Sequence, residues 1–134
     1  FVCDGVYNDS KSTIPSATKL AVDSFENPSK LHLIVGGYDK KNDLSLLAEQ
    51  AKRVSCLYAI GETKDSIFNL ARKNVFCFES LDEAIIDASK RMVEGDVLLL
   101  SPGCASWDQF DNYEQRGEVF CKVATEVVRN QQVR

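Results

Sequence analysis

Short apolar runs alternate with amphipathic stretches along most of the chain. The runs at residues 31–35, 56–60, 75–78 and 97–100 are four or five residues long and consist mainly of aliphatic and aromatic residues. Runs of this length are typical of strands that are buried on both faces, as in a parallel sheet. An edge strand is predicted at residues 2–7, and we expect a sheet of about six strands in all.

The stretches between the runs have the periodicity of helices. A first helix is predicted to begin at Pro15, because proline suits a first helical turn, and to continue to Phe25. A capping-box pattern, Ser-Leu-Asp-Glu, begins at Ser80 and predicts another helix start. The remaining helices are expected at residues 44–53, in a segment after Thr63, and at residues 117–130.

Strands that alternate with helices predict an α/β fold of the doubly wound, Rossmann-like kind, with a mostly parallel sheet and helices on both faces. No repeat or linker interrupts the pattern, so residues 1–134 are predicted to form a single domain. The chain begins at Phe1 inside an expected strand, which suggests a fragment of a longer protein. In such folds ligands bind beyond the carboxyl ends of the strands, so the loops there are the candidate sites.

Composition narrows the possible partners. The chain is 44% hydrophobic and 27% charged, which favours a globular protein over a disordered one. Its net charge is −4 and it has no basic cluster, so nucleic acid is not an expected partner. It also has no apolar run long enough to span a bilayer, so we expect a cytoplasmic protein with no membrane partner.

The cysteines and the histidine do not form a recognisable site. The five cysteines are widely spread without a CxxC pair, and the one histidine, His32, lies in an apolar run. We therefore expect reduced thiols, no disulfide framework and no metal site. Cys104 lies near Ser106, but no histidine is placed to activate either group, so nucleophilic catalysis is disfavoured.

Two polar loops follow predicted strands. The first loop, residues 8–13, has the sequence Asn-Asp-Ser-Lys-Ser-Thr and leads into a helix N-terminus, which favours anions. The second loop, residues 36–43, starts with two glycines that let backbone approach a ligand, and Lys40 follows as a point charge. It is neither a Walker loop nor a GxGxxG motif. A solvated turn remains the alternative for each.

The third loop, residues 101–117, follows the most hydrophobic strand. A connection of that length in a compact domain usually has a function. Its small residues up to Ser106 would leave room for a ligand, and its backbone N–H groups could receive a carboxylate. Alternatively, Trp107, Phe110 and Tyr113 would form a small satellite core under the loop.

Taken together, the three loops resemble the C-terminal domain of Mur ligases. The first loop resembles the family's Asn-Asp-Ser-Lys-x-Thr segment, and the second is similar to its Gly-Gly-x-x-Lys loop. The third, Leu-Ser-Pro-Gly-Cys-Ala-Ser-Trp-Asp-Gln-Phe at residues 100–110 with Glu-Gln-Arg-Gly at residues 114–117, resembles the D-glutamate-adding members. The resemblance covers the whole chain in order.

This resemblance implies a bacterial, cytoplasmic, ATP-dependent ligase that joins D-glutamate to UDP-N-acetylmuramoyl-L-alanine in peptidoglycan synthesis, and so serves cell-wall growth, shape and division. ATP would convert the carboxylate of the nucleotide substrate into an acyl phosphate, which the amino nitrogen of D-glutamate attacks. The UDP-binding domain and the central ATPase domain, which holds most of the Mg²⁺ ligands, would lie outside this chain. The fragment alone is therefore expected to be inactive.

The resemblance also implies roles for individual residues. Asp9 would hold the ribose of the ATP cofactor, and Lys11 would act as the catalytic cation near the terminal phosphate or the acyl phosphate. The residues implied to bind the D-glutamate carboxylates are Thr13, Lys40, Ser106, Trp107 (through its backbone) and Tyr113.

Two alternatives stay open. The chain could belong to another Mur ligase or a folylpolyglutamate-type ligase, because the first two loops are shared more widely than the third. It could also be a stand-alone nucleotide-binding module, which the fold pattern alone would allow.

Overall fold

Five strands form one sheet in the computed structural model, which describes residues 5–132. They are β1 (Val6–Asn8), β2 (Leu31–Gly36), β3 (Cys56–Ile60), β4 (Val75–Phe78) and β5 (Val97–Leu100). Their order is β1-β5-β2-β3-β4, and every pairing is parallel. The parallel α/β sheet is confirmed, whereas the expected count of about six strands is wrong, since residues 5–132 contain five. Residues 2–4 of the predicted edge strand lie outside the described residues.

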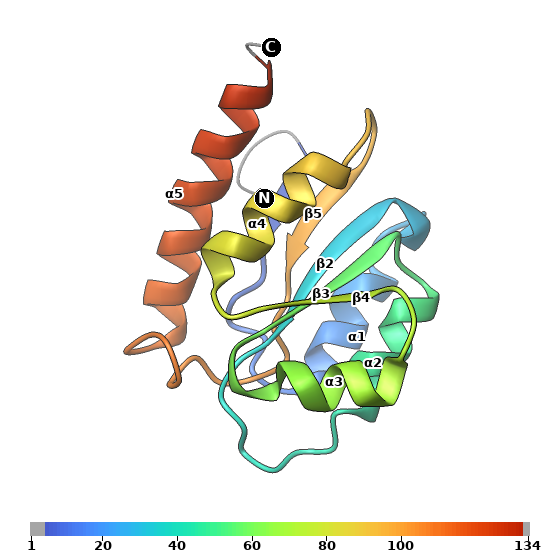
Figure 1. Ribbon diagram of the computed structural model, residues 1–134, viewed down its shortest axis with the longest axis vertical. Coiled ribbons are helices and arrows are strands. Elements are labelled where there is room, and N and C mark those ends of the chain that lie inside the picture. Colours follow the sequence, from blue (N-terminus) through green and yellow to red (C-terminus); the bar gives the residue numbers. More distant parts are fainter. Residues whose placement is uncertain (1–4, 133–134) are drawn as a thin grey trace.

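Helices cover both faces of this sheet (Figure 1). They are α1 (Pro15–Asp23), α2 (Ser45–Glu49), α3 (Lys64–Ala71), α4 (Leu81–Arg91) and α5 (Tyr113–Gln132). The first three lie on one face, and α4 and α5 lie on the other, as a doubly wound fold requires. Within residues 5–132, no helix has the length and apolar character needed to cross a membrane.

Local capping explains where the helix predictions succeed and fail. α1 begins at Pro15 as predicted. α4 begins at the predicted cap, because the hydroxyl of Ser80 accepts from the N–H of Glu83 (3.3 Å); the Glu83 carboxylate accepts from that same hydroxyl (3.0 Å), in place of the Ser80 N–H of a full capping box. The prediction that the last helix begins at Gly117 is wrong. The side-chain oxygen of Asn112 accepts from the N–H of Gln115 (2.8 Å), and this cap starts α5 four residues earlier.

Two other helix boundaries also differ from the prediction. α1 ends at Asp23 instead of Phe25. The helix predicted at residues 44–53 is a short α2 followed by a 3-10 turn, Gln50–Lys52, because the chain tightens its last turn before β3. The last five residues of the third loop, 113–117, belong to α5, so the connection after β5 is shorter than predicted.

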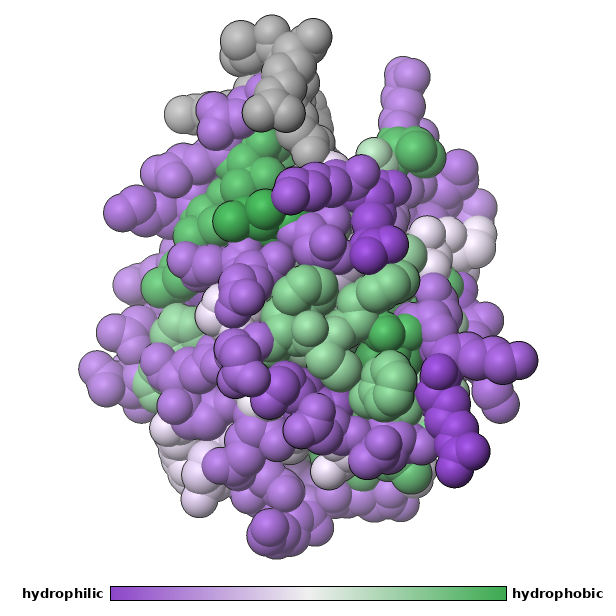
Figure 2. Space-filling view, viewed as in Figure 1, coloured by the Kyte–Doolittle hydropathy of each residue, from purple (hydrophilic) through white to green (hydrophobic). Residues whose placement is uncertain are grey.

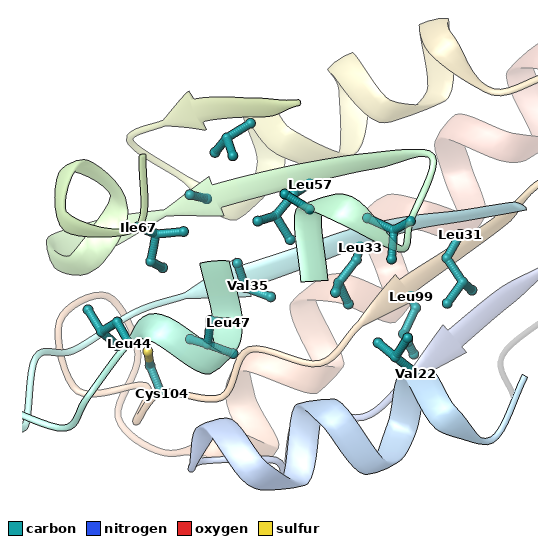
Figure 3. Close-up of a cluster of buried hydrophobic side chains, with 14 residues drawn as sticks. Val22, Leu31, Leu33, Val35, Leu44, Leu47, Leu57, Ile67, Leu99 and Cys104 are labelled. Atoms are coloured by element: carbon teal, nitrogen blue, oxygen red, sulfur yellow. The ribbon is translucent and has the colours of Figure 1, made fainter. Parts of the chain in front are cut away.

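The core lies in two layers, one on each face of the sheet. Figure 3 shows the first layer, in which Val22 of α1, Leu47 of α2 and Ile67 of α3 face the strands. Burial of each large aliphatic side chain contributes about 1.5–3 kcal/mol. The second layer packs α4 and α5 on the opposite face through side chains that include Leu81, Ile85, Phe120 and Ala124. Figure 2 shows the outer surface of the same view as mostly hydrophilic, with apolar patches near its centre.

A buried polar network fixes the amino end of the sheet. His32, which is 1% exposed, bonds through Nδ1 to the hydroxyl of Tyr58 (2.8 Å) and through Nε2 to the carboxylate of Asp96 (2.8 Å). Burial tends to raise the pKa of Asp96, but hydrogen bonds from His32 and the Val93 N–H outweigh it and leave the pKa below its ordinary value. The network therefore holds the turn before β5 against β2.

Asp96→Ala is expected to destabilise this domain by about 1–3 kcal/mol, because a buried ring nitrogen of His32 loses its partner. Because the pKa of Asp96 is lowered in the folded protein, its carboxylate contributes fully to stability at any pH above the ordinary pKa near 3.8. This contribution is lost as the pH falls through the lower pKa of the folded state. Native-state hydrogen exchange of β2 amides in the full-length protein measures this. The exposed Glu94→Ala, in the same turn, is the control, and equal stability of the two variants would contradict the role of the network.

Candidate functional site

The loops that follow β2 and β5 leave the sheet toward opposite faces. After β2 the chain passes to α2 on one face, and after β5 it passes to α5 on the other, although β2 and β5 are neighbours. This is a topological switch point, where parallel α/β sheets bind ligands. The first loop follows β1, which pairs in parallel with β5, so this loop also lies at the carboxyl ends of the strands, beside the end of β5.

Backbone hydrogen bonds join the three predicted loops. The N–H of Gly36 donates to Pro102 (2.9 Å), and the N–H of Tyr38 donates to Ala105 (2.8 Å). The N–H of Gly103 donates to the carbonyl of Ser12 (2.9 Å), which ties the third loop to the first. Segments about 65 and 90 residues apart along the chain are therefore held in fixed register at the switch point.

Asp9 lies where the first loop meets β5. Its N–H donates to the carbonyl of Leu100 (2.7 Å), and its Oδ2 accepts from the hydroxyls of Ser101 (2.8 Å) and Ser12. Among residues 5–132, no hydrogen bond reaches its other carboxylate oxygen, Oδ1. The carboxylate is thus held in place through one oxygen and keeps the other as an acceptor for a ligand hydroxyl.

Lys11 and Tyr113 line one open hollow of about 520 Å³ together with Asn8 and Cys121. Lys11 is exposed, and Tyr113, at the start of α5, is 40% exposed. The carbonyl of Tyr113 accepts from the hydroxyl of Ser10 (2.7 Å), so the first loop and α5 form the two walls of the hollow.

Lys40 and Trp107 come together from the second and third loops. The ammonium of Lys40 lies 4.4 Å from the centroid of the Trp107 ring, and the ring of Tyr38 lies 5.6 Å from that of Trp107. Ser106, next in sequence to Trp107, is buried. Because Trp107 is 60% exposed, it does not belong to the satellite core proposed as the alternative; only Phe110 of the three aromatic residues packs on the core.

The predicted site residues thus fall into separate groups at one edge of the sheet. Lys40 contacts Trp107, Lys11 shares a hollow with Tyr113, and Asp9 bonds to Ser12 and Ser101. In the part of the chain that the structure describes, no hydrogen bond, ion pair or ring contact joins Thr13 to another predicted side chain. The substrate-binding role of each residue stays a prediction.

The two glycines of the second loop are required for contacts within the protein. Gly36 has φ +106° and Gly37 has φ +147°. A Cβ at Gly36 would lie 2.4 Å from the carbonyl oxygen of Ile60, and one at Gly37 would lie 2.5 Å from that of Ala105. The glycines therefore allow neighbouring loops of the protein itself to pack closely against the second loop, where a close approach to a ligand was predicted.

Gly37→Ala is expected to destabilise the protein by about 1–3 kcal/mol, because the added Cβ collides with backbone that other hydrogen bonds hold in place. Gly95→Ala is the matched control: it also has positive φ (+90°), but no atom lies within 4 Å of its Cβ position. The difference between the two in native-state hydrogen exchange isolates the collision. Equal losses would show that backbone conformation alone matters.

A fourth loop at this edge was not predicted. The 3-10 turn after β3, Gly61–Thr63, contacts the second loop, where the hydroxyl of Thr63 accepts from the N–H of Gly37 (3.0 Å). It also contacts the third loop, since Asp108 accepts from the N–H of Glu62 (3.1 Å). Burial raises the pKa of Asp108. Gly61, directly after the apolar run 56–60, is the sequence feature that could have predicted this turn.

Arg116 of α5 is the largest fully buried side chain of the described residues, and it too was given no role from the sequence. Its Nε donates to the hydroxyl of Ser10 (3.0 Å), its Nη2 to the carbonyl of Ser10 (2.6 Å), and its Nη1 to the carbonyl of Cys104 (2.8 Å). Burial lowers the pKa of the guanidinium to about 10, so the group is still charged at neutral pH.

Cys104 is not a nucleophile in this arrangement. Burial raises the pKa of its thiol to about 11, so the thiol is protonated at neutral pH. The other described cysteines, Cys56, Cys77 and Cys121, are also free thiols, and Cys3 lies outside the described residues. Among residues 5–132, no group of three or more His, Cys, Asp or Glu side chains is arranged to hold a metal ion.

Comparisons with known proteins agree with this arrangement. A family model described as "Mur ligase, glutamate ligase domain" matches residues 2–104. The chain is 41% identical over 127 residues to a Caldicellulosiruptor bescii protein named UDP-N-acetylmuramoylalanine--D-glutamate ligase, with 91% of this chain and 27% of that protein covered. Proteins of the same name from Bacillus thuringiensis and Bacillus anthracis are each 36% identical to the chain over 126 residues. In both cases the match covers 91% of this chain and 28% of the relative. The chain therefore spans little more than a quarter of the length of these curated relatives.

Proposed function

The chain belongs to the Mur ligase family, and we propose that it is the C-terminal, amino-acid-binding domain of the ATP-dependent ligase that adds D-glutamate to UDP-N-acetylmuramoyl-L-alanine. The geometric observation that carries the proposal is the contact between Lys40 of the second loop and Trp107 of the third at the switch point of the sheet, with the buried Ser106 next to Trp107 in sequence. A cation meets the backbone of the third loop there, and such a pair could receive a carboxylate ligand.

D-Glutamate presents two carboxylates and one attacking amine. Lys40 would neutralise a carboxylate with a full charge, while the Ser106 hydroxyl and the backbone of Trp107 would supply oriented dipoles. Thr13 and Tyr113 would complete the contacts. The amine must be uncharged and unobstructed to attack, so the site has to hold the molecule by its carboxylates.

ATP and Mg²⁺ are the cofactors that this activity requires. The free oxygen of Asp9 suits a ribose hydroxyl, because the first oxygen is already held by Ser12 and Ser101. Lys11 would stabilise the negative charge that develops near the transferred phosphate and the acyl phosphate. Most Mg²⁺ ligands would come from the central ATPase domain of the complete protein.

The domain organisation follows from the same proposal. Residues 1–134 would form one domain, and the UDP-binding and ATPase domains would belong to the rest of a bacterial cytoplasmic protein. Because the phosphate loop would lie in that other part, the isolated domain is proposed to be inactive.

A ligation assay on the full-length protein tests the proposal. The protein is supplied with ATP, Mg²⁺ and UDP-N-acetylmuramoyl-L-alanine, and is offered D-glutamate, L-glutamate, L-alanine or lysine in parallel. Product with D-glutamate alone is the expected result. Product with another amino acid would replace the substrate assignment with that of another ligase of the superfamily, and no product would favour a stand-alone nucleotide-binding module.

A further inference from the structure

Arg116 is a buried cation without a carboxylate partner. It is 1% exposed, and its three hydrogen bonds go to one hydroxyl and two backbone carbonyls. No ion pair joins it to an acidic side chain among residues 5–132, and the carboxylate of Asp108 acts on it only as a nearby charge, without a direct bond. Removing a guanidinium from water is strongly unfavourable, and neutral acceptors compensate it less well than a carboxylate does.

The position of this charge is under the predicted site. Ser10 lies between Asp9 and Lys11 in the first loop, and Cys104 lies two residues before Ser106 in the third. The guanidinium also borders the second loop, since a Cβ at Gly37 would lie 3.4 Å from its Nη1. One side chain of α5 therefore bonds to the first and third loops and borders the second, and these three loops carry the predicted substrate and ATP ligands.

The hydrogen bonds of Arg116 also orient the peptide group before Lys11. In a trans peptide the C=O and the following N–H point in opposite directions, and no described peptide bond is cis. Holding the Ser10 carbonyl against the guanidinium thus directs the N–H of Lys11 away from it. The planar fork of arginine can bond Ser10 and Cys104 at the same time, which a lysine ammonium at the same position could not reproduce.

We propose that Arg116 is a positioning residue that couples the ATP-binding first loop to the amino-acid-binding third loop, and that its unpaired charge favours the anionic ligands bound above it. This inference rests on the proposed ligase function. It accounts for the absence of an ion pair to Arg116 among the described residues, because a carboxylate bonded directly to the guanidinium would cancel more of the positive potential that substrate carboxylates and phosphates need than the nearby Asp108 does.

The test compares Arg116→Lys with wild type in the full-length enzyme. Because both loops lose their common support, the KM for ATP and the KM for D-glutamate are expected to rise together, and kcat/KM to fall roughly 100-fold, as for a misplaced reacting group. Hydrogen exchange should increase at residues 8–13 and at residues 101–108 in the same variant. Arg91→Lys, an exposed arginine stacked on Phe76 (3.7 Å), should leave all of these values unchanged.

A purely structural role gives a different result. Loss of folded protein would lower kcat in proportion to the active fraction, with both KM values unchanged, and that outcome would overturn the proposal. Increased exchange in only one loop would overturn the coupling. Ser10→Ala keeps the guanidinium but removes one of its hydrogen-bond acceptors. It is therefore expected to raise both KM values, by a smaller factor than Arg116→Lys does. This variant replaces Arg116→Lys in the test if Arg116→Lys does not fold. A wild-type enzyme that fails to ligate D-glutamate would instead overturn the proposed function itself, and this inference with it.

Discussion

Lys11→Met in the full-length enzyme is expected to lower kcat by about 100- to 1,000-fold, as when one preorganised donor to a developing negative charge is removed. Lys11 is exposed in an open hollow, and no hydrogen bond or ion pair to it is found among residues 5–132. Its charge is therefore available to a ligand. The proposed role near the transferred phosphate predicts that the KM for D-glutamate changes little, because the effect arises in the transition state.

Steady-state kinetics combined with single-turnover measurements of phosphate release would locate this loss in the chemical step. Lys19→Met is the matched control, because Lys19 lies on α1 and forms an exposed ion pair with Asp23 (2.8 Å). Its kcat should match wild type. If Lys11→Met raised only the KM for ATP and left kcat intact, Lys11 would be a binding residue and its proposed catalytic role would be wrong.

The fold class could be predicted because its signals are local. Apolar runs of strand length alternate with helical periodicity, and Pro15 and Ser80 mark helix starts through interactions within one turn. The start of α5 was missed because the cap that sets it, Asn112, lies inside a segment interpreted as loop. The predicted number of about six strands exceeded the five found in residues 5–132 because the sequence offered only five segments of strand length, so the sixth strand had no segment of its own.

The site was predicted only as far as residue type and loop position allow. Lys40 and Trp107 lie in different loops, and their contact could be expected once both loops were placed at the carboxyl edge of the sheet. Arg116 could not be assigned in this way, since its contact with Ser10 joins residues 106 positions apart. Its burial depends on how α5 packs, which no local pattern in the sequence reports.

The paired glycines illustrate the same limit. Their presence after β2 predicted a close approach of the backbone to a ligand, and the groups that lie close to them in the structure are the carbonyls of Ile60 and Ala105. The switch point thus combines two features. Gly36 and Gly37 allow the loops at the carboxyl end of the sheet to pack tightly, and charged side chains of these loops project outward, where they can reach ligands.

Lys40→Ala in the full-length enzyme is expected to raise the KM for D-glutamate by about 10- to 100-fold, the range for losing a charge-assisted hydrogen bond, while the KM for ATP stays within about twofold. Lys40 is exposed, and its ammonium is held over the Trp107 ring at 4.4 Å, so it is positioned without a competing carboxylate among the described residues. Trp107→Leu removes that support and should raise the same KM by a smaller factor, about 2- to 5-fold.

Lys41→Ala is the matched control, because Lys41 is the next residue, is 88% exposed and pairs with Asp39. Equal changes in the two KM values for Lys40→Ala would contradict its assignment to the amino acid, because a lysine that holds only the D-glutamate carboxylate has no direct contact through which to weaken ATP binding.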